Sequence, residues 1–561
     1  MGNPIFRPAR PVLRGRGLGG ELMLAALFFM ALAGCSKTAD PQSASGGNSW
    51  TQAGTVRIGY HEEPNNLNPV ISNEAASSDV NTLIYSRLLD IDEQGGLVPA
   101  LATRVPSKAN GGISSDGKTI TYHLRRGVRW QDGRPFTAAD VIFTWQALMN
   151  PRNNVDSRVG YDQIASMSAP DRYTVIVHLK RVYSPAVAFL FTGGDLGSIV
   201  PRHLLAKYAN VNSIPFNDSP IGTGPYRMVR WQHGASIDLE ANDLYFGGRP
   251  KVRFIHIRYY GDLNTLLSAF EAHELDMYNY APEYQFEQLN GLAGTRVDVT
   301  GNWTYAQIGL NTRRPFLRDL RVRQALDFAI NKKAIADKIY HNVDVVAHGD
   351  MPPSSWAYNG GDVARPYDPQ LATALLAQAG FVPSRDGVLQ RNGQPLTLEL
   401  TTVTGRIERE QAELLVQQDL QKIGIRTTVH NYPATILFAT HGDGGILANG
   451  HFDLALYEWQ IPAFDPDDTQ TMGPQQIPPA GDNYTFLSDP RIGALQKHAL
   501  RTYDIMTRKA DYRRVQRLLF EQAPVIFLVW KSNIDAYNSD LQHFKPEHVG
   551  CPWWNAATWE I

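Results

Sequence analysis

Cysteine usage is the strongest constraint on this chain of 561 residues, because the first of its two cysteines closes a pattern typical of an export signal. Four arginines within the first 16 residues precede an apolar run from Leu22 to Ala31, and Cys35 follows shortly after. A basic start, an apolar segment of about ten residues and a small-residue cleavage site are typical of bacterial export. The run is too short to span a bilayer, which takes roughly 20 apolar residues. If Cys35 marks the cleavage site, Cys551 has no partner, so the exported chain must fold without a disulfide.

The four residues Leu32 to Cys35 resemble a lipobox, in which the cysteine thiol is diacylated and becomes the first residue of the mature protein. This resemblance implies that residues 1–34 are a lipoprotein signal peptide and that Cys35 carries the lipid. Residues 35–53 are rich in small and polar residues, so we expect a flexible tether there. The chain is therefore expected outside the cytoplasm, lipid-anchored to a bacterial membrane on the periplasmic side or at the cell surface.

The length exceeds the size at which a single core keeps growing, so two or three lobes are expected. The formal net charge is −2 and becomes more negative once the arginine-rich signal is removed, which predicts no surface for nucleic acid. Aromatic residues make up 10% of the chain, which is typical either of a large core or of a cleft that stacks on a ligand.

Strand and helix patterns alternate irregularly, which indicates a mixed α/β protein. Alternating apolar residues predict strands at Val56–Tyr60, Thr119–Leu124 and Leu396–Leu400. The segment Val525–Trp530 is apolar throughout, as in a strand buried on both faces. Helices are predicted from apolar residues at helical spacing or from capping signals, over residues 141–149, 322–335, 368–380 and 412–423.

None of the familiar catalytic or metal-binding patterns is convincing. Gly112–Thr119 matches a phosphate-binding loop formally, but a strand follows it instead of a helix, so Asp116-Gly117 is interpreted as a hairpin turn. The histidines form no tight pair, so no metal site is expected. We therefore predict no catalytic residues, no cofactor and no enzyme activity.

Seven short sequence segments follow one another in the order found in one protein family. They are Glu63–Pro69, Ile84–Asp90, Leu97–Ala102, Ser115–Val141, Pro220–Tyr226, Asn311–Leu326 and Phe452–Leu456. On these segments the chain resembles the extracytoplasmic solute-binding proteins of family 5, the substrate-binding lipoproteins of peptide, opine and nickel ABC importers. The agreement runs from about residue 55 to 535, nearly the whole mature chain.

The resemblance implies an α/β fold of the periplasmic-binding-protein class II type, with two lobes facing a cleft and an extra domain inserted in lobe one. The implied boundaries are 54–94, 218–308 and 522–561 for lobe one, 95–217 for the inserted domain and 309–521 for lobe two. Crossings between the lobes are predicted near Trp303–Asn311 and Gln522–Lys531. Gly222 and Gly224 are expected to set turns.

The function that the resemblance implies is capture of a small polar ligand by lobe closure and its delivery to the permease and ATPase subunits of an ABC importer. The ligand would be a peptide, a modified peptide or an oligosaccharide, and the receptor a monomer. Two alternatives stay open. One is a ligand-sensing or chaperone-like lipoprotein not coupled to transport, and the other is a lipid-anchored hydrolase.

The resemblance also indicates candidate site residues. In peptide-binding relatives an acidic residue soon after a tryptophan holds the ligand's α-amino group, but alignment on Trp459 and Asp465 places Pro462 there. This departure predicts weak binding of free-amine peptides and favours N-blocked peptides or oligosaccharides. Arg406 lies where some relatives hold the ligand carboxylate. The full set of candidate ligand-binding residues is Trp459, Tyr457, Glu458, Asp465, Arg406, Trp303, Tyr305 and Glu63.

Overall fold

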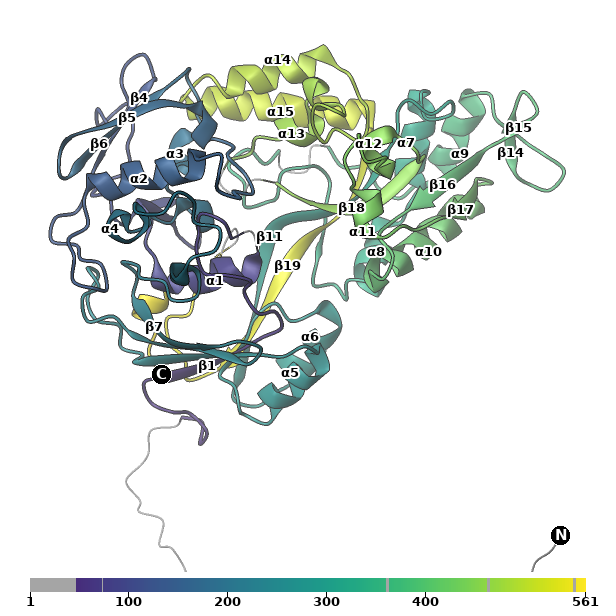
Figure 1. The fold of residues 1–561 in the computed structure, drawn as a ribbon. Helices are drawn as coiled ribbons and strands as arrows, with labels where there is room; N and C mark the ends of the chain where they lie inside the picture. Colours follow the sequence, from purple (N-terminus) through teal and green to yellow (C-terminus); the bar gives the residue numbers. More distant parts are fainter. Residues whose placement is uncertain (1–46, 73, 360–362, 462–464, 548–550) are drawn as a thin grey trace, which may run out of the picture. The chain divides into compact units, whose positions relative to one another are not determined.

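In the computed structural model, two long strands, β11 (Thr295–Leu310) and β19 (Val525–Asn538), pair antiparallel at the centre of the largest sheet (Figure 1). The structure describes residues 47–561 except residue 73 and residues 360–362, 462–464 and 548–550. Cys35, the proposed signal peptide and Pro462 lie outside the described residues. Within the described part of the chain, no helix has the length and apolar character needed to cross a membrane.

The largest sheet has eleven strands among the described residues, ten of them in the order β17-β16-β18-β11-β19-β10-β1-β9-β8-β7, while β12 pairs with β19. The other strands are β1 (Thr55–Tyr60), β7 (Tyr226–Gln232), β8 (Ser236–Ala241), β9 (Phe254–Tyr259), β10 (Met277–Tyr278), β12 (Val345–Val346), β16 (Thr397–Thr401), β17 (Arg426–Val429) and β18 (Leu454–Gln460).

The two central strands change neighbours half-way along their length. Residues 295–301 of β11 pair with residues 532–538 of β19, and there β19 also pairs with β10. Residues 304–310 of β11 pair with β18 on the side opposite to β19, while residues 305–309 remain paired with residues 525–530 of β19. The register breaks between Gly301 and Tyr305. Each long strand therefore passes once from one half of the sheet to the other, and the predicted crossings lie beside this break.

We call the half that contains β10, β1, β9, β8 and β7 lobe one. Its helices are α1 (Ala75–Ile84), α5 (Leu263–Glu271) and α6 (Phe286–Asn290). The alternating burial of β8 and β9 fits strands with one covered face. The C-terminal segment returns to this lobe, where Trp553 and Trp559 are fully buried in its core. The end of the chain therefore contributes directly to lobe one.

A further domain follows α1 in the sequence and shares the core of lobe one. Its sheet has the order β4 (Thr119–His123), β6 (Thr174–Leu179) and β5 (Ile164–Asp171). The helices beside it are α2 (Ala138–Met149), α3 (Ala186–Phe189) and α4 (Arg202–Leu205), and the hairpin β2 (Leu89–Ile91) and β3 (Leu97–Pro99) precedes them. A capping box of Thr137 and Asp140 starts α2, as the sequence predicts.

Lobe two contains β16, β17 and β18. Its helices are α7 (Leu320–Ala329), α8 (Lys332–Lys338), α9 (Pro369–Gln378), α10 (Ile407–Lys422), α11 (Ala434–Leu437), α12 (Ile446–Asn449), α13 (Thr469–Met472), α14 (Pro490–Ala499) and α15 (Ile505–Gln522). A small sheet of β13 (Val382–Pro383), β14 (Leu389–Arg391) and β15 (Gln394–Pro395) extends from it.

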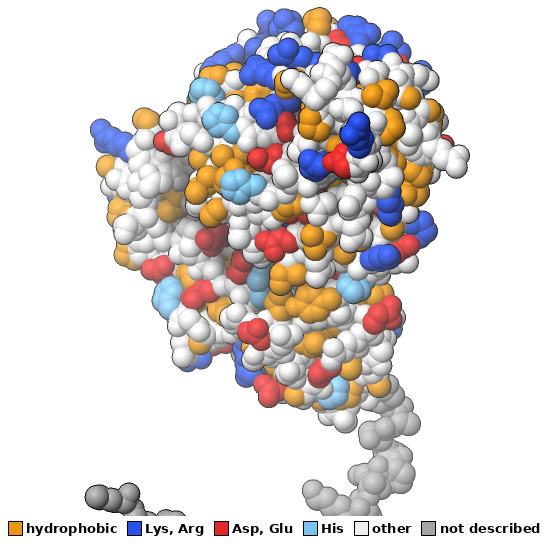
Figure 2. Space-filling view, turned by 90° about the vertical axis from the view of Figure 1, so that its right-hand side faces the viewer, with side chains coloured by type: hydrophobic (Ala, Val, Ile, Leu, Met, Phe, Trp, Pro, Cys, Tyr) orange, Lys and Arg blue, Asp and Glu red, His pale blue; other side chains and the backbone are white. Residues whose placement is uncertain are grey.

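Figure 2 shows Lys and Arg side chains gathered at the top of the face that it draws. Figure 1 places α14 and α15 at the same height.

Three local predictions need correction. The predicted helix over residues 322–335 is two helices, because Asn331 caps a new helix by accepting a hydrogen bond from the Ala334 N–H. Helix α10 begins at Ile407, earlier than predicted. The sequence predicts a tether up to residue 53, but Asn48 donates to the Gly294 carbonyl (2.9 Å) and Trp50 stacks on His273 at 3.6 Å. The folded part therefore begins at Asn48.

Candidate functional site

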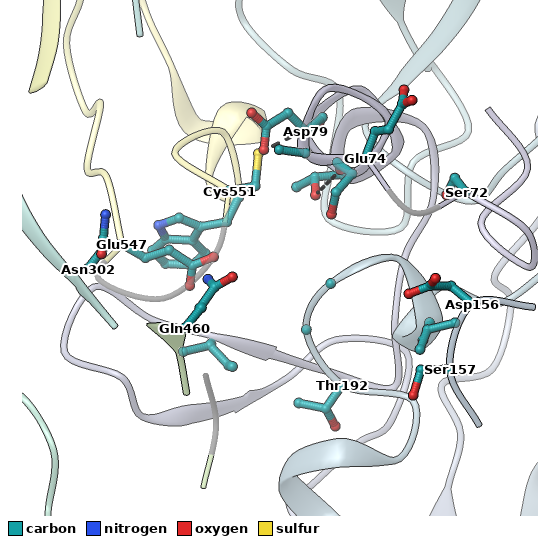
Figure 3. Close-up of a pocket in the computed structure, with 18 of the residues that line it drawn as sticks. Ser72, Glu74, Asp79, Asp156, Ser157, Thr192, Asn302, Gln460, Glu547 and Cys551 are labelled. Carbon is teal, nitrogen blue, oxygen red and sulfur yellow. Dashed lines mark hydrogen bonds between the residues drawn. The ribbon is translucent and has the colours of Figure 1, made fainter. Parts of the chain in front are cut away.

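A cavity of about 730 Å³ lies where the two lobes meet. Lobe one supplies the end of β1, helix α1, the loops at 156–161 and 189–196, and the C-terminal segment, whereas lobe two supplies the end of β18 and α13. Asn302 and Asn533 line it from the two crossing strands. Figure 3 shows Glu547 and Gln460 reaching into this space from one side and Asp156 from the other.

Within lobe one, the end of helix α1 lies unusually close to the backbone of residues 222–224, just before β7. The Gly224 N–H donates to the Ile84 carbonyl at 2.8 Å. A Cβ atom on Gly222 would lie 1.9 Å from the same carbonyl oxygen, a distance no side chain tolerates. These glycines therefore allow the backbone before β7 to approach the end of α1, rather than setting turns as the sequence predicts.

The floor of the cavity lies at the break between the paired strands. Asn302 Nδ2 donates to Asn533 Oδ1 at 2.9 Å, which ties β11 to β19 where their register is interrupted. Because both amides line the cavity, a bound molecule would contact the same residues that link the two lobes.

Acidic side chains dominate the charge of the cavity. Its described lining contains six carboxylates and one guanidinium, together with His61. The acids are Glu62, Glu74, Asp79, Asp90, Asp156 and Glu547, and the base is Arg87. Tyr60 donates to Asp79 at 2.7 Å, and Arg87 Nη1 lies 3.7 Å from Asp90 Oδ1. Burial raises the pKa of Glu547 well above its usual value.

Of the eight candidate residues, Trp459 is the one that the cavity lining includes. It is half-buried near the end of β18, with its ring 6.4 Å from that of Tyr484 in an edge arrangement. Its exposed part is therefore available for stacking on a ligand.

Three other aromatic candidates belong to the core. Tyr457 is 2% exposed and packs edge-on against Phe438 and Tyr484. Trp303 and Tyr305 are buried, and the Tyr305 ring contacts those of Phe527 and Trp530 at 5.3 and 5.1 Å. None of these three lines the described cavity.

The charged candidates are engaged elsewhere or exposed. Glu458 pairs with Arg409 on α10 at 2.5 Å, and buried Asp465 pairs with Arg508 on α15 at 2.5 Å.

Glu63 binds the β7–β8 hairpin, accepting from Trp231 Nε1 and the Gly234 N–H, both at 2.8 Å. Arg406 is exposed at the start of α10 and does not line the cavity. The structure therefore does not bring these four together around the cavity.

The acidic residues of the cavity are the ones that sequence reasoning missed. Glu547 follows Lys545-Pro546 in a segment without strand or helix periodicity, so no pattern marks it. The tryptophan pair at 553–554 is the available signal that this segment packs against the folded part of the chain. Trp553 is buried, and Trp554 lines the cavity.

The arrangement of two lobes around a lined cavity agrees with what is known of similar proteins. Residues 96–474 match the family model described as bacterial extracellular solute-binding proteins, family 5 middle. The chain belongs to this family. Its two-lobed α/β periplasmic-binding fold is confirmed by solved structures that cover most of the chain.

Individual relatives bind different solutes. The chain is 27% identical over 535 residues to the oligopeptide-binding protein AppA of Bacillus subtilis, covering 93% of this chain and 94% of that protein. The structure of AppA in complex with a nonapeptide has 26% identity and a TM-score of 0.71, and covers 91% of this chain and 99% of that chain. NikZ from Campylobacter jejuni in complex with Ni(L-His) has 27% identity and a TM-score of 0.72, and covers 91% and 100%.

Among the described residues, no group of three or more His, Cys, Asp or Glu side chains is placed to hold a metal ion. The family is one of substrate-binding proteins of transporters rather than of enzymes.

Proposed function

We propose that the chain is a membrane-anchored extracytoplasmic receptor that captures a peptide or a similar polar solute by lobe closure and delivers it to an ABC import permease. In this account Cys35 carries the lipid, residues 36–47 form the tether, and the folded part from Asn48 acts as a monomer. Family membership and the peptide-bound relative support a peptide-sized solute.

Contacts on the far side of the cavity carry the proposal of closure. The Ser184 hydroxyl, in the inserted domain, donates to the Ala499 carbonyl at 2.9 Å, and its N–H donates to Leu500. The Tyr503 hydroxyl donates to the Tyr183 carbonyl at 3.2 Å. These contacts join lobe one to lobe two at a place separate from the crossing strands. The crossing strands β11 and β19 therefore connect the lobes covalently on one side of the cavity. On the other side, the hydrogen bonds of Ser184 and Tyr503 connect them and can break.

A ligand that touches both lobes stabilises the form in which these contacts exist, so binding shifts the population toward that form. Closure of this kind is a binding equilibrium and involves no chemical step. A sensor or chaperone-like lipoprotein would use the same closure, but it would not need an ABC permease.

Small-angle scattering tests closure directly. Addition of an equimolar mixture of di- to pentapeptides to the folded part should reduce the radius of gyration and raise the melting temperature. Ligand at one hundred times its Kd stabilises the native state by about 2.7 kcal/mol. A peptide that raised the melting temperature without changing the radius of gyration would contradict capture by closure. Loss of peptide uptake on deletion of this receptor, but not of a neighbouring sensor kinase, would support transport over sensing.

A further inference from the structure

The inner wall of the cavity has an unbalanced charge. Against six lining carboxylates the described lining offers one guanidinium, that of Arg87, which is 5% exposed. Arg87 is already held in place, since its Nε donates to the Gly194 carbonyl at 2.9 Å and its Nη2 to the Thr82 hydroxyl at 2.8 Å. Its remaining nitrogen faces Asp90. Arg87 is thus the cation that acts on both Asp90 and Glu547.

Glu547 is the acid for which this shortage is most evident. It is 7% exposed and lines the cavity, and Figure 3 shows it reaching into the space near Gln460. The Cys551 N–H hydrogen bonds to the carboxylate. Glu547 Oε2 has no hydrogen-bond partner among the described residues. A buried carboxylate oxygen in a cavity without a donor is a position that a ligand can satisfy.

The groups around Glu547 reinforce the need for a positive charge. Asp79 and Asp90 make its ionisation harder, whereas Arg87 and the hydrogen bond from the Cys551 N–H make it easier. Burial is the largest cause of its raised pKa. Arg87 and the Cys551 N–H do not offset this burial, so a further positive charge beside Glu547 would favour its ionised form.

We propose that this wall binds a cationic group of the ligand, an ammonium or a guanidinium, and that Glu547 is the carboxylate that pairs with it. The proposal rests on the proposed function, because it names the class of solute that the same cavity takes. Asp79 and Asp90 strengthen the negative potential around the bound cation, and Trp459 offers an aromatic surface to the rest of the ligand. This proposal predicts the opposite of the alignment at Pro462, which predicts that N-blocked or uncharged ligands bind better.

A pair of substitutions isolates the role of Glu547. Glu547→Gln keeps the size of the side chain and resembles the protonated acid, so the fold should be retained, as a melting temperature without added peptide can show. Glu62→Gln is the matched control, because Glu62 lines the same cavity but its side chain is 60% exposed to solvent. Both variants remove one carboxylate.

The probe is a library of random pentapeptides, mixed in equal amounts with the same library after N-acetylation. The library is incubated with the folded protein, and retained peptides are released by denaturation and quantified by mass spectrometry. We expect peptides with a free amine, lysine or arginine to be enriched at least tenfold over acetylated peptides without a basic residue. The two acetylation states, compared with and without lysine or arginine, distinguish a terminal ammonium from a basic side chain. Glu547→Gln should reduce this enrichment at least tenfold, and Glu62→Gln less than threefold.

Equal retention of cationic and neutral peptides would overturn the proposal while leaving solute capture intact. An enrichment that survives Glu547→Gln unchanged would also overturn it. Failure of the parent protein to retain peptides of any charge would overturn the proposed peptide receptor together with this inference.

Discussion

Lys531 is the residue whose removal should weaken the connection between the lobes most. It follows the point where β11 and β19 change neighbours, and its ammonium group binds both Asp344 and Glu283. Glu283 precedes α6 in lobe one, whereas Asp344 lies between α8 and β12 in lobe two. One lysine therefore holds acids from both lobes.

The expected loss of stability follows from the burial of the three charged side chains. The side chains of Lys531 and Glu283 are 15% and 14% exposed, and that of Asp344 is fully buried. Burial raises the pKa of Asp344 to about 7, even though Lys531 opposes that shift. Removing one partner of a buried ion pair costs about 3–5 kcal/mol, because a remaining acid must either stay charged without compensation or take up a proton. Lys531→Met should lower the free energy of unfolding at pH 7 by about this amount.

Urea denaturation of the parent and variant measures this loss. Lys251→Met is the matched control, because Lys251 and its partner Glu560 have side chains 68% and 39% exposed. Loss of such a surface pair costs about 0–1 kcal/mol. Adding Asp344→Asn to Lys531→Met should recover part of the stability, since the amide neither carries a charge nor has to take up a proton. A cost for Lys531→Met no larger than that of the control would refute the reasoning.

Three further outcomes are expected. Burial raises the pKa of Asp467 and of Asp535 to about 7, so the folded state keeps protons that the unfolded state releases between about pH 4 and 7. The melting temperature should therefore fall as the pH rises through this window, and a rise would contradict these assignments. Tyr503→Phe removes a hydrogen bond worth about 0.5–1.5 kcal/mol between the lobes, so captured peptide should bind roughly two- to tenfold more weakly with the fold intact. Unchanged affinity, by calorimetry, would remove Tyr503 from closure. Cys35→Ala should move the protein from the membrane to the soluble fraction without altering its melting temperature, and retention at the membrane would refute lipidation at Cys35.

Local signals in the sequence predicted many of the elements well. Asp368-Pro369 predicted the start of α9, and Asp368 indeed caps it by accepting from the Leu371 N–H at 2.8 Å. The uninterrupted apolar run Val525–Trp530 predicted a strand buried on both faces, and all six residues are buried in β19. Such signals are reliable because caps and burial patterns act over a few neighbouring residues.

The site was harder to predict, since it depends on which part of a strand other elements cover. Tyr457 and Trp459 share one face of β18, as residues two apart must. The side chains of Phe438 and Tyr484 cover Tyr457, whereas Trp459 near the strand end reaches the cavity. Spacing alone could not separate a core tyrosine from a lining tryptophan.

The acids of the cavity were missed for a different reason. Asp79 lies on a helix of lobe one and Glu547 on the C-terminal segment, hundreds of residues apart. Only the return of the chain to lobe one brings them to the same wall. The alignment at Pro462 concerns a single position, whereas the proposed counter-charge, Glu547, lies on a segment distant in sequence.

The most direct test of the account is the identity of the molecule that the receptor carries. The exported, lipid-anchored protein should be purified and then denatured. The small molecules that it releases should be identified by mass spectrometry. We predict a peptide or similar polar solute with a free ammonium or guanidinium group, at up to one molecule per chain and strongly reduced in Glu547→Gln. A carried solute that is uncharged or acidic, at the same level in both proteins, would contradict the account.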